Sequence, residues 1–125
     1  MDKKRIVIFE KYDGVRFVLE RCLEKYKDDL DIFASHWKNE IKGHIQNQPV
    51  DLLITELSKY NPDGLELSIY AREISPDLHI IWITVLGCDI FRQQKKEIGK
   101  ITCIEKPLEI KSFRQNILQV LEIST

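Results

Sequence analysis

An α/β protein with a doubly wound, five-stranded parallel sheet and about five helices is predicted for this chain of 125 residues. Short apolar runs rich in β-branched residues alternate five times with segments that carry apolar side chains at helical spacing. The connections are short, and no repeat or low-complexity segment interrupts the alternation. This pattern is typical of right-handed β-α-β crossovers, which build a parallel sheet with helices on both faces.

Each predicted strand is an almost continuous apolar run, because a strand of a parallel sheet is covered on both faces. The fourth strand is the most apolar of the five and contains Trp82. The predicted strands are residues 5–9, 31–34, 51–55, 79–85 and 101–104.

The helical segments carry apolar side chains three and four residues apart, which is the spacing of a helix with one buried face. Trp37 begins the second of these stripes, so we expect it to be at least half-buried. The fourth segment has only a few apolar residues and predicts a short or loosely packed helix. The predicted stripes lie in residues 15–26, 37–45, 65–74, 88–97 and 110–121.

Length and composition predict a single domain over residues 1–125. Hydrophobic residues make up 43% of the chain and charged residues 31%, which excludes a disordered or fibrous protein. Nineteen basic and 20 acidic residues leave a net charge of −1, so no field attracts nucleic acid or an anionic membrane. Apolar stretches such as Ile80–Ile83 are too short to cross a bilayer. We expect neither nucleic-acid nor membrane binding.

The three cysteines are odd in number and far apart, and they form no C-x-x-C pair. They predict no disulfide framework, which fits a reducing compartment and a cytoplasmic protein. Cys22 and Cys103 lie in apolar patterns and are expected to be small buried hydrophobic residues. Cys88 lies in a loop and is a less favoured candidate for a reactive thiol.

In a sheet of this type, functional residues are expected beyond the carboxyl ends of the strands. Glu10 follows the first predicted strand, Glu56 the third and Lys106 the fifth, while Thr84 lies at the end of the fourth. Two carboxylates, a hydroxyl and an ammonium group are therefore expected at one edge of the sheet.

These positions, with Asp63-Gly64-Leu65-Glu66-Leu67 and Lys106-Pro107, resemble the response-regulator receiver (CheY-like) family over nearly the whole chain. The resemblance implies a flavodoxin-like topology and a role in bacterial two-component signal transduction. It places Glu56 at the phospho-acceptor position, Glu10 and Lys11 at the acidic pair, Thr84 and Cys103 at switch positions, and Lys106 at the family's lysine.

Three departures from the family pattern predict a degenerate pseudo-receiver. Glu56 replaces the usual aspartate and is one methylene longer, and Lys11 places an ammonium where a metal-binding carboxylate is expected. Cys103 replaces the usual aromatic residue. We therefore expect a protein that is not an enzyme, has no cofactor or metal, and acts by protein–protein interaction.

The alternative is a phospho-accepting response regulator with an altered Mg²⁺ site that includes Glu10 and Glu56. A flavin- or nucleotide-binding protein is less favoured, because only Gly14 follows the first strand where a glycine-rich loop would be needed. Glu56 could mimic phosphoaspartate, but a static salt bridge with Lys106 or Lys11 is favoured. For Glu10, an exposed loop acid is favoured over a metal ligand.

Partners are expected to be signalling proteins, bound through the face formed by the fourth helix, fifth strand and fifth helix. The run from Arg92 to Lys96 lies on this helix and is either part of that face or simply solvated. A homodimer through the same face is also possible under the family resemblance.

Overall fold

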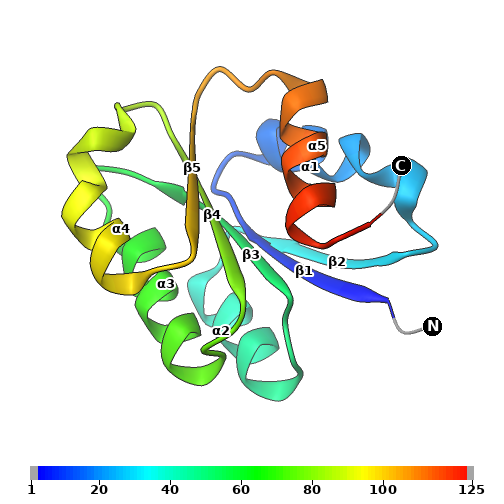
Figure 1. Cartoon of the computed structure of the whole chain (residues 1–125), viewed down its shortest axis with the longest axis horizontal. Helices are drawn as coiled ribbons and strands as arrows, with labels where there is room; N and C mark the ends of the chain where they lie inside the picture. Colours follow the sequence, from blue (N-terminus) through cyan, green and yellow to red (C-terminus); the bar gives the residue numbers. More distant parts are fainter. Residues whose placement is uncertain (1–2, 124–125) are drawn as a thin grey trace.

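Five parallel strands form a single sheet in the order β2-β1-β3-β4-β5 (Figure 1). The computed structural model describes residues 3–123, so the first and last two residues of the predicted domain lie outside the described residues. Strand β1 lies between β2 and β3. The chain adds β2 on one side of β1 and β3, β4 and β5 on the other, so the strand order reverses direction between β1 and β3. The strands are β1 (Lys4–Phe9), β2 (Leu30–Ser35), β3 (Leu52–Leu57), β4 (His79–Thr84) and β5 (Ile101–Glu105).

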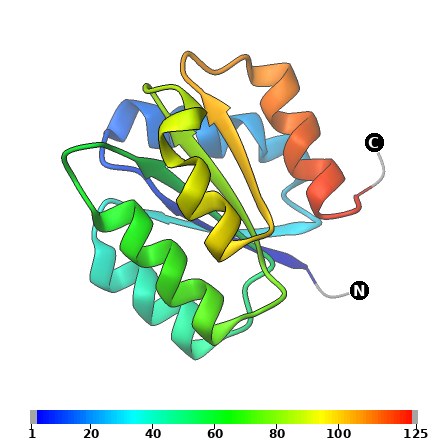
Figure 2. The same cartoon turned by 60° about the vertical axis from the view of Figure 1, so that its left-hand side comes forward.

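Helices cover both faces of this sheet, which confirms the predicted fold class (Figures 1 and 2). Helices α1 and α5 pack on one face, and α2, α3 and α4 on the other. Among residues 3–123, no helix is long and apolar enough to cross a membrane. The helices are α1 (Asp13–Cys22), α2 (Lys38–Asn47), α3 (Asp63–Ile74), α4 (Arg92–Ile98) and α5 (Ile110–Val120), with short 3₁₀ helices η1 (Glu24–Tyr26) and η2 (Cys88–Phe91).

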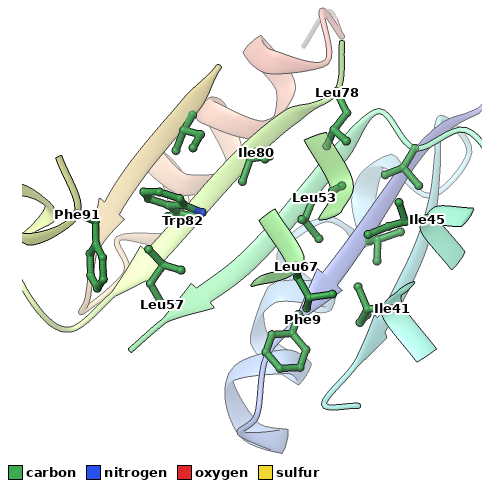
Figure 3. Packing of buried hydrophobic residues seen from close by; sticks show 14 residues of the cluster. Phe9, Ile41, Ile45, Leu53, Leu57, Leu67, Leu78, Ile80, Trp82 and Phe91 are labelled. Carbon is green, nitrogen blue, oxygen red and sulfur yellow. The ribbon is translucent and has the colours of Figure 1, made fainter. Parts of the chain in front are cut away.

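The buried hydrophobic side chains form two clusters, one on each face of the sheet. Successive residues of a strand point to opposite faces, so Val7 and Phe9 of β1 join one cluster while Ile6 and Ile8 join the other. Figure 3 shows the cluster beneath α2 and α3, in which Ile41, Ile45 and Leu67 pack against the strands.

Trp82, in the middle of β4, is completely buried in the cluster beneath α2 and α3. Its indole N–H donates a hydrogen bond of 2.8 Å to Ser68 Oγ. Its ring forms a T-shaped pair with the ring of Phe91, with the centroids 6.1 Å apart (Figure 3). Trp37 differs from its prediction, because it precedes α2 and is 61% exposed. The apolar stripe of that helix therefore begins only at Ile41.

The fourth helix is short, as its few apolar residues predicted. Helix α4 has seven residues and buries none of them fully. The preceding η2 is anchored by Phe91, whereas Ile90 is 54% exposed. Phe91 and the half-buried Ile98 are the side chains through which this segment packs on the hydrophobic cluster.

The prediction that the chain forms no disulfide is wrong. Cys88, at the start of η2, is disulfide-bonded to Cys103 of β5, and their Cα atoms are 6.0 Å apart. Fifteen positions separate the two residues in the sequence, but the fold places η2 directly beside β5. Cys103 is consequently half-buried and bonded rather than a free, buried hydrophobic residue. The cysteine argument for a reducing compartment no longer applies, although Cys22 is free and buried as predicted.

Candidate functional site

Three of the predicted site residues meet at the carboxyl edge of the sheet. Glu10 directly follows β1, Glu56 is the next-to-last residue of β3, and Lys106 directly follows β5. The Lys106 ammonium lies 2.8 Å from Glu56 Oε2 and 3.2 Å from Glu10 Oε1. One cation thus bridges two carboxylates that come from neighbouring strands.

This ion-paired cluster is largely shielded from water. The side chains of Lys106 and Glu56 are 15% and 13% exposed, and that of Glu10 is only 1% exposed. The aromatic ring of Tyr12 lies 5.8 Å from the Lys106 ammonium, within cation–π distance. The low exposure makes these charge interactions stronger than those of a surface salt bridge.

The expectation of an exposed Glu10 is wrong. The loop after β1 folds over its side chain, and the Tyr12 backbone N–H donates to Glu10 Oε2 at 3.2 Å. Arg16 of α1 donates to the Glu10 carbonyl at 2.7 Å and so fixes the backbone. Burial raises the pKa of the Glu10 carboxyl, and the negative charge of Glu56 raises it further. The Tyr12 N–H and the Lys106 ammonium only partly oppose this rise.

Burial alone would lower the pKa of Lys106, but its partners reverse that effect. The hydrogen bond to Glu56 and the charge of Glu10 stabilise the ammonium, so its pKa is raised above its usual value. Lys106 therefore remains charged under all ordinary conditions and compensates the negative charge that the two glutamates share.

Lys11 does not join the cluster. Its side chain is exposed, and among residues 3–123 it makes no ion pair with either glutamate. Of the two predicted partners for Glu56, the structure selects Lys106. Sequence spacing placed Lys11 beside Glu10, but adjacent residues at the end of a strand point in different directions.

Thr84 ends β4 and is completely buried. Its hydroxyl oxygen accepts a hydrogen bond of 3.1 Å from the Leu86 backbone N–H, and its carbonyl accepts one of 2.8 Å from the Lys106 N–H. Thr84 thus ties the loop after β4 and the residue after β5 to the same point. Cys103, the second predicted switch position, is committed to the disulfide.

No family model matches the chain, but individual proteins do. It is 28% identical over 120 residues to the response regulator receiver protein CpdR of Brucella abortus, covering 94% of this chain and 97% of that protein. It is 22% identical over 125 residues to the sporulation initiation phosphotransferase F of Bacillus subtilis, covering 98% of that protein. A CheY-like receiver domain structure from Methanospirillum hungatei aligns with a TM-score of 0.84 and 19% identity, covering 97% of this chain and 95% of that one.

The chain is similar in sequence over almost its whole length to response-regulator receiver proteins, and it has the fold of receiver domains. The sequence matches run through almost the whole chain, and the strand order is the one that the resemblance implied. Among residues 3–123, no three His, Cys, Asp or Glu side chains gather as a potential metal-binding cluster.

Gly64 and Arg16 are two site residues whose roles the sequence did not reveal. A Cβ added to Gly64 of α3 would lie 2.0 Å from the carbonyl oxygen of Glu56, so only glycine lets this helix approach β3 so closely. The family resemblance marks Asp63-Gly64 as a motif, and the structure supplies a physical reason for its glycine. No sequence pattern indicated that Arg16 would reach the Glu10 carbonyl.

As the pH rises, the unmodified chain is expected to lose stability because of Glu10, and the variant Glu10→Gln should not show this loss. Because folding raises the pKa of Glu10 above its ordinary value of 4.5, the folded chain binds this proton more tightly than the unfolded chain. The resulting stability is fully present below the unfolded pKa and is lost as pH rises through the folded pKa. The free energy of unfolding of the unmodified chain, relative to the variant, should therefore fall across this window.

Urea unfolding of both proteins between about pH 4 and pH 8 measures this difference. Glu20→Gln, at an exposed position of α1, is the matched control. A difference between the unmodified chain and Glu10→Gln that stays constant with pH would contradict the assignment of this titration to Glu10.

Proposed function

We propose that this receiver domain acts in two-component signalling by protein–protein contact, without a conventional cycle of aspartyl phosphorylation. The single observation that carries the proposal is the simultaneous pairing of Lys106 with Glu10 and Glu56, at 3.2 and 2.8 Å. The charges that a phosphoryl group and a metal ion would need are already paired with one another.

The acceptor position supports this proposal. Glu56 is one methylene longer than aspartate, and its Oε2 atom is held against the Lys106 ammonium. Attack on a phosphoryl group requires the nucleophile in line with the leaving group, and a misplacement of about 1 Å can cost about 100-fold in rate. We therefore propose that Glu56 forms a static salt bridge and is not a phospho-acceptor.

The donor set also fits a divalent cation poorly. Mg²⁺ prefers nearly octahedral coordination by oxygen, with one or two carboxylates that are free to bind it. Here both carboxylates already accept hydrogen bonds from Lys106, and Lys11 adds a cation to the same loop. We accordingly propose that the domain has no metal cofactor and no enzymatic activity.

The alternative, a phospho-accepting domain with an altered Mg²⁺ site, has one observation in its favour. Two carboxylates do converge at the edge of the sheet, and a metal ion that displaced the Lys106 ammonium would meet both of them. The test of the proposal must therefore detect metal binding and phosphoryl transfer separately.

For partner binding, we propose the face formed by α4, β5 and α5. Val85, directly after β4, and Ile90, in η2 just before α4, are 72% and 54% exposed, and such apolar side chains are suited to contact with another signalling protein. A homodimer through the same face remains a prediction.

The proposed function is tested by following backbone amide resonances during titration with millimolar Mg²⁺ and then with beryllofluoride, a phosphoryl mimic. Intact-mass measurement after incubation with acetyl phosphate tests covalent transfer. We expect no saturable shifts at Glu10, Glu56, Thr84 or Lys106, and no added phosphoryl mass.

The matched control is the double variant Lys11→Asp/Glu56→Asp, which restores the family's acidic residues and should gain a Mg²⁺ response. Saturable shifts or a phosphoryl adduct in the unmodified chain would overturn the proposal in favour of the altered metal site.

A further inference from the structure

The Cys88–Cys103 disulfide joins two segments that otherwise share few contacts. Cys88 begins η2, and Cys103 lies in β5, the edge strand of the sheet. Both cysteines are half-exposed, whereas Cys22 is 5% exposed and packs on the opposite face. An attacking thiolate needs access to a sulfur atom, so the Cys88–Cys103 bond is open to exchange while Cys22 is shielded.

Few other contacts hold η2 against the sheet. The Cys88 backbone N–H donates to Glu105 Oε1 of β5 at 3.0 Å, and Phe91 packs against Trp82 of β4. Val85, before η2, and Ile90, within it, are exposed, and α4 buries none of its side chains fully. A segment with so few buried apolar contacts is one that opens locally at low cost once a covalent tie is removed.

We propose that Cys88 and Cys103 form a reversible thiol–disulfide pair that fastens η2 and the start of α4 to β5 when oxidised and releases them when reduced. The pair is a modification site for cellular dithiols and low-molecular-weight disulfides. This proposal is independent of whether Glu56 accepts a phosphoryl group, because it concerns a different set of atoms.

The exchange is balanced at each step. A thiolate of a dithiol reductant attacks one sulfur of the Cys88–Cys103 bond and forms a mixed disulfide, and the other cysteine leaves as a thiolate that takes up a proton. The second thiol of the reductant then displaces the bound cysteine, which is also protonated. The reductant becomes a cyclic disulfide, and two electrons pass to the cysteine pair. In the reverse direction, oxidised glutathione is reduced to two glutathione molecules.

The consequence is local, because the disulfide lies on one face of the sheet. Cys103 packs with the cluster that contains Trp82 and Phe91, whereas α1 and α5 pack with the other cluster. Figure 1 shows α4 beside β5, with α1 on the other side of that strand. Reduction should therefore loosen residues 85–91 and leave α1 and α5 unchanged.

The test equilibrates the full chain in glutathione buffers of different ratio, alkylates free thiols and counts them by intact mass. We expect a transition between one and three free thiols that follows a two-electron equilibrium with glutathione. In hydrogen exchange followed at peptide level, amides of residues 85–91 should exchange at least about tenfold faster in the reduced form. Far-ultraviolet circular dichroism should show that both forms stay folded.

Cys22→Ser is the matched control and should keep the whole transition. Cys88→Ser and Cys103→Ser should abolish it and show the exchange pattern of the reduced form in every buffer. The proposal is overturned if oxidised glutathione does not form the bond, if a thioredoxin-type dithiol does not reduce it in the folded chain, or if residues 85–91 exchange equally in both forms. The comparison of the two forms of the unmodified chain decides the matter even where a cysteine variant fails to fold.

Discussion

Lys106→Met is expected to lower the free energy of unfolding at neutral pH by about 3 kcal/mol, near the low end of the usual cost of breaking a buried ion pair. Methionine has nearly the same length but loses the two ion pairs and the cation–π contact with Tyr12, so the loss is chiefly electrostatic. Without the ammonium, Glu10 and Glu56 face each other in a site that water hardly reaches. One of them must then take up a proton or be forced apart from the other.

Urea unfolding at several pH values measures this effect. The deficit should shrink as pH falls, because protonation of the carboxylates removes their mutual repulsion. The triple variant Lys106→Met/Glu10→Gln/Glu56→Gln carries no charge in the cluster and should regain most of the lost stability. A deficit that is independent of pH, or one that the triple variant does not relieve, would show that Lys106 stabilises the domain by something other than its two ion pairs.

Gly64→Ala is expected to destabilise the domain by about 3 kcal/mol, the upper part of the range for overpacking. The new methyl group would lie 2.0 Å from the Glu56 carbonyl oxygen and 2.9 Å from Thr55 Oγ1. Backbone atoms of a central strand cannot yield as the end of a flexible side chain does. Helix α3 must move away from β3, and the Glu56 carboxylate should move with the strand end.

Gly43→Ala is the matched control, because Gly43 lies inside helix α2 and an added Cβ meets nothing within 4 Å. Alanine there should stabilise the domain by about 0.5–1 kcal/mol through its better helix propensity. Thermal or urea unfolding compares the two variants, and the amide resonance of Glu56 reports the displacement. Equal stability of the two variants would contradict the close approach of α3 to β3.

The fold was largely predictable because a parallel sheet imposes a simple pattern on its sequence. Buried strands such as β4 (His79–Thr84) are largely apolar on both faces, and the one-sided stripe of residues 110–121 predicts a helix. Trp37 misled this reasoning because an apolar residue just before a helix fits the periodic stripe without being on the helix. Periodicity describes residues inside an element and is weakest at its ends.

The site was predictable in position but not in environment. The predicted strands place Glu10, Glu56 and Lys106 at the carboxyl edge of the sheet, and in the structure these three side chains meet there. Whether Glu10 is covered depends on how the loop after β1 folds, which no periodic pattern encodes. The disulfide was missed for a similar reason, because the distance between Cys88 and Cys103 is set by the packing of η2 on an edge strand and not by their separation along the chain.

The division of the hydrophobic interior into two clusters has a consequence for engineering this domain. The sheet backbone lies between the clusters, and among residues 3–123 no buried side chain belongs to both. Substitutions on opposite faces share no partners, so their effects on stability should simply add. One face of the sheet carries the disulfide and helices α2, α3 and α4, and this face can therefore be redesigned. Helices α1 and α5 on the other face then stay unaltered and serve as an internal standard in the same molecule.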